Sequence, residues 1–152
     1  MNVRAIAAVL AASLAMAGTM PAHAGSMGVA LDSAIYVERM NGLTRSLRQA
    51  DRLSRGDRIV TILTWQKQGG LKNDNAGFTV VNPLPRTVAY QGSARDDEQV
   101  SVDGGKTWGR LGELTAGSRL ATAEDVTHVR WHVDPRQAAI GQGRIAYSGI
   151  VR

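Results

Sequence analysis

A run of alternating side chains near the middle of the chain predicts the central strand of a β-sheet. Residues 59–65 are almost all β-branched or aromatic, and turn-forming glycines bound the run at Gly56 and at Gly69-Gly70. Alternate side chains of a strand point to opposite faces of the sheet. One face would carry Ile59, Thr61, Leu63 and Trp65, and the other Val60, Ile62 and Thr64. Because both sets are largely apolar, we expect this strand to lie mid-sheet or to be covered on both sides.

Shorter segments with the same two-residue period predict further strands. They cover residues 33–40, 78–81, 87–90, 100–108 (a hairpin around Asp103-Gly104-Gly105), 127–133 and 144–151. The segment 78–81 is expected to stop at Asn82-Pro83, because proline donates no backbone hydrogen bond. The stretch from Leu43 to Ser54 has both helical spacing and strand-like polar residues, and a short edge strand is favoured.

The segment 127–133 has the most regular alternation in the chain. Val129, Trp131 and Val133 are expected to face inward, and His128, Arg130 and His132 to face solvent. Trp65 and Trp131 are therefore the predicted core tryptophans. With seven to eight short strands and no long helix, the pattern predicts an all-β fold, an Ig-like antiparallel β-sandwich.

The N-terminus has the pattern of a cleaved export signal. Arg4 precedes an apolar run from Ala5 to Ala17, and Ala22-His23-Ala24 has the small-x-small pattern of a signal-peptidase site. The run is shorter than the roughly 20 apolar residues that a membrane-spanning helix needs. We expect a signal peptide over residues 1–24 and one domain over residues 25–152. The protein would then be exported, to the periplasm or the cell surface.

Composition restricts the chemistry that is open to the chain. It has 152 residues, no cysteine and a formal net charge of +5, so disulfides and thiolate metal sites are excluded. Export argues against a nucleic-acid partner. The densest basic stretch, from Arg45 to Arg58, suits either an anionic envelope polymer or a charged edge that discourages strand pairing.

Residue patterns of known enzyme sites are missing from the sequence. His128 and His132 are four residues apart on a strand, about 13 Å, which is too far for both to bind one zinc ion. No Gly-x-Ser-x-Gly motif occurs, and the acidic run Asp96-Asp97-Glu98 is expected to be a solubilising loop. We therefore predict a protein that is not an enzyme and has no cofactor or metal.

Several turn-and-strand motifs lie between about Ser33 and Arg152: Gly56-Asp57, Gly69-Gly70, Phe78-Thr79-Val80-Val81-Asn82-Pro83-Leu84-Pro85, Tyr90-Gln91-Gly92-Ser93 and Gly141-Gln142-Gly143 before Ile145-Ala146-Tyr147. Together they resemble a known family, the prokaryotic conserved-repeat domain of unknown function that is numbered eleven in its series. The resemblance implies an Ig-like β-sandwich of the cell envelope or surface. Members often occur in tandem, and some are filament subunits.

A second resemblance concerns the segment Ser101-Val102-Asp103-Gly104-Gly105-Lys106-Thr107-Trp108, which fits the Asp-box pattern Ser-x-Asp-x-Gly-x-Thr-Trp of sialidases and other propellers. In those proteins the motif is a folding device at a hairpin. One copy in a domain of this size cannot form a propeller. We expect Asp103 to accept hydrogen bonds from turn amides and Trp108 to pack beside the hairpin. Ser101, Gly105 and Thr107 would be structural.

These observations predict an exported, non-enzymatic domain with a structural or contact role in the envelope or outside the cell. One alternative is a self-assembling subunit whose segment Gly25 to Met40 adds as a strand to a neighbour's sheet. Another is a module that binds an envelope glycan or anionic polymer through His128, Arg130 and His132, or through the basic edge. Expected partners are an envelope polymer, another envelope protein or a second copy of the chain.

Overall fold

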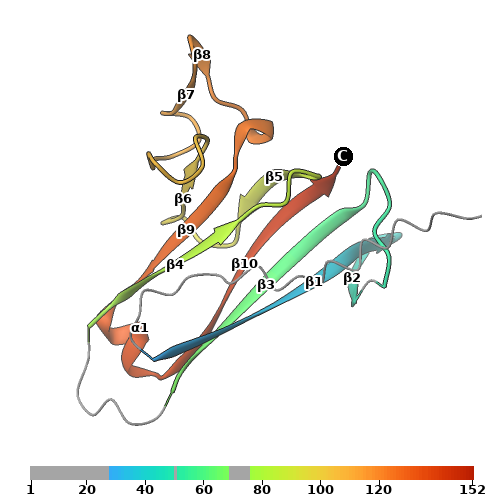
Figure 1. Cartoon of the computed structure of the whole chain (residues 1–152). Coiled ribbons are helices and arrows are strands. Elements are labelled where there is room, and N and C mark those ends of the chain that lie inside the picture. The colour runs from blue at the N-terminus through green and yellow to red at the C-terminus, as the bar shows by residue number, and fades with distance from the viewer. Residues whose placement is uncertain (1–27, 50, 69–75) are drawn as a thin grey trace, which may run out of the picture.

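The computed structural model of the chain describes residues 28–49, 51–68 and 76–152, and over these residues the protein is almost entirely β-structure (Figure 1). A larger sheet has the strand order β2-β1-β3-β10-β5 and a smaller sheet the order β4-β9-β6. The larger sheet contains β1 (Val29–Asn41), β2 (Thr44–Gln49), β3 (Arg58–Lys67), β5 (Val88–Ser93) and β10 (Gln142–Val151). The smaller contains β4 (Phe78–Pro83), β6 (Gln99–Ser101) and β9 (His128–Val133). All pairings are antiparallel, which confirms the all-β class.

Strand β3 is the middle strand of the larger sheet and pairs with both β1 and β10. Its first face is buried, as the alternation predicts, and carries Ile59, Thr61, Leu63 and Trp65. Leu63 and Trp65 belong to the cluster that includes the smaller sheet, whereas Ile59 packs with Val37, Val88 and Val151 in a second hydrophobic cluster. Its second face, with Val60, Ile62 and Thr64, points away from the smaller sheet. The strand is thus mid-sheet, and the smaller sheet covers part of one of its faces.

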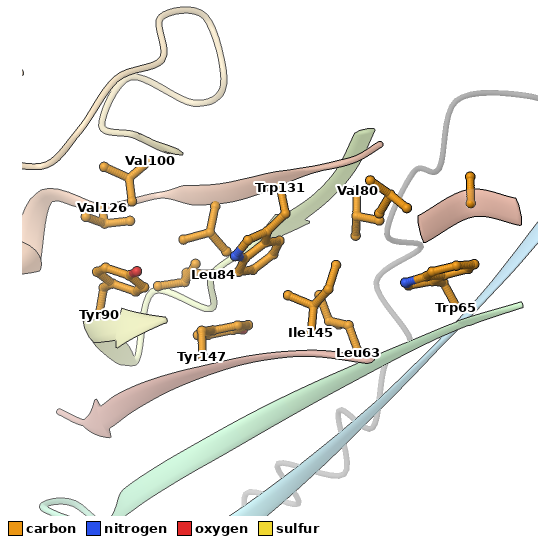
Figure 2. Packing of buried hydrophobic residues seen from close by; sticks show 13 residues of the cluster. Leu63, Trp65, Val80, Leu84, Tyr90, Val100, Val126, Trp131, Ile145 and Tyr147 are labelled. Carbon is orange, nitrogen blue, oxygen red and sulfur yellow. The ribbon is translucent and has the colours of Figure 1, made fainter. Parts of the chain in front are cut away.

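The core lies between the two sheets and is built around Trp131 and Tyr147 (Figure 2). Trp131 is fully buried, and its ring stacks on the Tyr147 ring with centroids 6.0 Å apart. The Asn82 amide donates to the Tyr147 hydroxyl at 2.9 Å, so the only polar group of this ring is paired inside the core. Burial raises the pKa of Tyr147. The residue therefore acts as a neutral packing element.

Trp65, the second predicted core tryptophan, packs against a glycine of the neighbouring strand. It is 3% exposed and lies opposite Gly143 in the ladder between β3 and β10. A Cβ atom added to Gly143 would lie 2.6 Å from two ring carbons of Trp65. The indole also meets the Phe78 ring edge to face, at a centroid distance of 5.1 Å. Gly143 thus makes room for the indole, a role that its expected place in a turn did not suggest.

Several boundaries differ from the expected ones. Ten strands are assigned over the described residues, two of them the two-residue strands β7 (Thr115–Ala116) and β8 (Arg119–Leu120) of a separate hairpin. The segment from Leu43 to Ser54 contains β2, as favoured. Strand β4 continues through Asn82 to Pro83, because an edge strand tolerates a residue without an N–H.

Two short helices, η1 (Ala123–Asp125) and α1 (Pro135–Ala139), were not expected. Asp134 caps the N-terminus of α1, because its carboxylate accepts from the Gln137 backbone N–H, and Pro135 is the first residue of the helix. The expected signal peptide and Gly69-Gly70 lie outside the described residues. No helix in the described part is long and apolar enough to cross a membrane.

Candidate functional site

The Asp-box segment forms a tight turn held by one carboxylate. Asp103 accepts hydrogen bonds from the Lys106 N–H at 3.0 Å, the Thr107 N–H at 2.9 Å and the Thr107 hydroxyl at 2.7 Å. The Ser101 hydroxyl also donates to it, at 2.8 Å. These donors, the Thr107 backbone first among them, lower the pKa of Asp103 far below its ordinary value. Asp103 is therefore a charged structural anchor, as expected from the resemblance.

Backbone groups fasten this turn to the start of β9. Gly104 and Gly105 have φ angles of 80° and 89°, which favour glycine, and the Gly105 N–H donates to the Ser101 hydroxyl at 2.9 Å. The Gly104 N–H donates to the Thr127 hydroxyl at 3.1 Å, and that hydroxyl donates to the Ser101 carbonyl at 3.1 Å. The turn therefore has a fixed position over the outer face of the smaller sheet.

Trp108 ends the turn and lies over that outer face. Its indole N–H donates to the Gly105 carbonyl at 3.0 Å, which orients the ring. The Arg130 guanidinium carbon lies 4.5 Å from the ring centroid, in cation–π geometry, and the His128 ring meets the indole edge to face at 6.3 Å. All three side chains are half-buried. Trp108 thus partly covers two of the residues that were expected to face solvent freely.

Arg130 is held in place without an acidic partner. Its Nε donates to the Gln99 side-chain oxygen at 2.8 Å, while Trp108 covers one face of the guanidinium. None of the ion pairs among the described residues involves Arg130, and its two terminal nitrogens have no hydrogen-bond partner there. An ordered guanidinium with two free donors suits a carboxylate, sulfate or phosphate group. We call the surface made of Gln99, Trp108, His128 and Arg130 the Trp–Arg face.

His132 is separate from the Trp–Arg face. It is exposed, two positions beyond Arg130 on β9, and pairs across the ladder with Thr79. Its electrostatic neighbour is Asp97, which forms an ion pair with Arg95. The structure therefore brings together two of the three predicted contact residues, His128 and Arg130, and leaves His132 next to an acid. Within the described ranges, no three His, Asp or Glu side chains are placed to hold a metal ion.

The acidic run before β6 is not uniformly exposed. Asp97 pairs with Arg95, but Glu98 turns inward and accepts from the Tyr90 hydroxyl at 3.3 Å. Burial and the Glu98 carboxylate raise the pKa of Tyr90. The second Glu98 oxygen is buried and has no hydrogen-bond partner in the described part of the chain. The expectation of a solubilising loop is wrong for Glu98.

Sequence reasoning missed Gln99 and Thr127, which position the predicted residues. Gln99 faces Arg130 in the β6–β9 ladder, and Thr127 bonds to the turn. Neither belongs to a motif, so only the pairing of β6 with β9 would have found them.

Comparison of the chain with known proteins finds no matching family model, no similar curated protein and no similar solved structure. The site is thus defined by its own geometry.

Proposed function

We propose that this chain is an exported, non-enzymatic β-sandwich domain of Ig-like type, and that it binds an anionic envelope polymer through the Trp–Arg face. The observation that carries the proposal is the Arg130 guanidinium, fixed by Gln99 and Trp108 and free of any described carboxylate. The N-terminal pattern of the sequence supports export. The two-sheet arrangement and the resemblance of the strand motifs support an Ig-like type.

An acidic polysaccharide fits this face better than a neutral ligand does. The guanidinium offers two parallel N–H donors to an acidic group, and hydrogen bonds to charged groups contribute about 1.5–3 kcal/mol. The half-buried Trp108 ring supplies an apolar surface beside the charge, where a sugar ring of the same polymer can pack. His128 supplies a further polar side chain against the same indole.

The alternative of strand donation has less support. Strand β1 pairs with β3 in a long ladder that runs from Val29↔Lys67 to Val37↔Ile59. The segment that would join a neighbour's sheet is therefore already used within its own chain, and donation would require this ladder to open.

The test is retention of the protein on heparin–agarose, a sulfated polysaccharide, during elution with a salt gradient, with uncharged agarose as the blank. Arg130→Ala removes one charge and the fixed guanidinium. Arg130→Lys keeps the charge but lacks the planar pair of N–H donors that a guanidinium offers to an acidic group. We expect both variants to elute at lower salt, with Arg130→Ala binding about tenfold more weakly, the equivalent of one charged hydrogen bond.

Arg86→Ala is the matched control, because Arg86 is exposed in the loop before β5 and its loss changes the net charge equally. It should elute close to the unchanged protein. If Arg86→Ala and Arg130→Ala reduce retention by the same amount, binding reflects net charge alone and the Trp–Arg face is not the site.

A further inference from the structure

The outer face of the larger sheet, on the side away from the smaller sheet, is apolar at its centre. Two adjacent rows cross β1, β3 and β10 in register. One row consists of Tyr36, Val60 and Ser148, and the next of Ala34, Ile62 and Ala146. Antiparallel sheets with one solvent-facing side usually alternate apolar and polar residues, so an apolar outer face indicates a contact surface.

No described element packs over these rows. The smaller sheet lies on the opposite side of the larger one (Figure 1), and neither hydrophobic cluster of the described residues includes Val60, Ile62 or Ala146. Helices η1 and α1 make their main contacts to the larger sheet at β5 and β10 respectively. Val60 at the centre of the face is 6% exposed and the other five residues of the two rows are half-buried, so an occupant would cover a surface that is only partly exposed.

One acidic and one basic residue lie on opposite sides of the outer face, next to the apolar rows. The row next to the apolar rows carries Asp32 on β1, Thr64 on β3 and Arg144 on β10. Asp32 and Arg144 are exposed, and neither has a hydrogen-bond or ion-pair partner among the described residues. One strand lies between them, so their backbones are about 10 Å apart. The face thus has an acid on one side and a base on the other.

We propose that a second copy of this chain packs face to face on the outer face, about a two-fold axis parallel to β3. Such a rotation keeps each row in place and exchanges the positions of β1 and β10. Asp32 of each copy then faces Arg144 of the other, and the apolar rows meet at the centre. Sheets that pack in this way lie about 10 Å apart, within reach of an arginine and an aspartate. A two-fold interface requires this kind of self-complementary surface.

The order of charges favours a second copy over other occupants. An anionic lipid surface would be repelled by Asp32 on β1, which has no ion-pair partner among the described residues. An apolar segment such as residues Ala5–Ala17 would cover the central rows but leave Asp32 and Arg144 unpaired. At the other margin Arg58 lies on the middle strand near the axis, and the Glu38 carboxylate of β1 is already paired with Arg45.

The dimer has a consequence for ligand binding, which rests on the proposed function. Since the two larger sheets would meet at the centre, the two smaller sheets and their Trp–Arg faces would lie on opposite outer sides. The dimer would therefore bind two segments of polymer and link them, with a gain in avidity.

The test is sedimentation of the purified chain over a concentration series, with its N-terminus established by mass spectrometry. We expect a monomer–dimer equilibrium. Ile62→Asp places a charge in the apolar centre and should abolish the dimer, whereas Leu120→Asp, at an exposed residue of the β7–β8 hairpin, should leave it intact. Thermal melts of each variant identify any that do not fold.

Charge exchange tests the arrangement without altering the apolar rows. Asp32→Arg and Arg144→Asp should each weaken the dimer at least tenfold, because each creates two like-charge contacts. The double variant should restore it, and mixing the two single variants should give a heterodimer. A chain that stays monomeric at all concentrations, or a dimer that the charge variants do not change, would overturn the proposal.

Discussion

Replacement of Trp131 by alanine should be among the most destabilising changes in the chain. The side chain is fully buried between the sheets and stacks on Tyr147. A buried tryptophan removes about 200 Å² from water, which at about 25 cal/mol per Å² stabilises the fold by roughly 5 kcal/mol. Alanine retains the small part of this stabilisation that comes from burial of the Cβ atom, while the cavity left by the indole adds to the loss. We therefore expect the free energy of unfolding to fall by about 3–5 kcal/mol.

The hydrogen bond of Trp131 contributes little to this figure. Its indole N–H donates to the Ser93 hydroxyl at 3.0 Å, but that hydroxyl also donates to the Ala146 carbonyl and accepts from the Arg95 N–H. Ser93 is therefore not left without partners when the indole is removed. The loss should come from packing, and Trp131→Phe, which keeps most of the ring area, should recover more than half of it.

Urea unfolding followed by far-ultraviolet circular dichroism measures this loss. With a denaturant slope of about 2 kcal/mol per molar, the midpoint of Trp131→Ala should fall by roughly 2 M. Trp108→Ala is the matched control, because Trp108 is half-buried on the surface of the smaller sheet and its removal should cost about 1 kcal/mol. A cost below about 1 kcal/mol for Trp131→Ala would show that the two sheets do not pack as described.

Two further predictions concern stability. Gly143→Ala should cost about 1–3 kcal/mol, because the new Cβ would meet the Trp65 ring at 2.6 Å, whereas Gly112→Ala, with no atom within 4 Å, should be neutral in the same urea assay. Acid should also destabilise the protein. The pKa values of Asp103 and Asp125 are lowered by the Thr107 backbone and by Arg119 respectively, from an ordinary value of 3.8. Each carboxylate therefore stabilises the fold above that value, and this stability is lost as pH falls below about 4. The melting temperature should drop over that range, and Asp103→Asn should make the drop shallower; an unchanged slope would contradict the role of Asp103.

The strands were predictable where one face is buried and the residues alternate. Residues 59–65 and 127–133 follow this rule, since a one-residue shift would expose Leu63 or Trp131. The boundaries were less predictable, because they depend on pairing between distant segments. Strand β4 extends to Pro83 only because its outer edge is unpaired, and β1 starts at Val29 because β3 is long enough to pair with it.

The candidate site was predictable in its residues but not in its arrangement. The Asp-box pattern located the turn, and alternation placed His128 and Arg130 on one face. No sequence rule placed Trp108 over Arg130, because their contact depends on the hydrogen bonds of Thr127 to the turn and on the pairing of β6 with β9. Nor did a sequence rule place Asp97, paired with Arg95, beside His132.

A single Asp box in a small sandwich has a physical use that does not depend on repetition. A free arginine loses side-chain entropy when it binds, at a cost of about 0.5–1.5 kcal/mol for each immobilised side chain. Here the Asp103 turn fixes Trp108, and Trp108 and Gln99 fix Arg130 before any ligand arrives. Part of the side-chain entropy of Arg130 is thus lost when the turn folds and not when a ligand binds. A turn that serves only folding would not require the ring at its end to lie 4.5 Å from a guanidinium that has no ion-pair partner among the described residues.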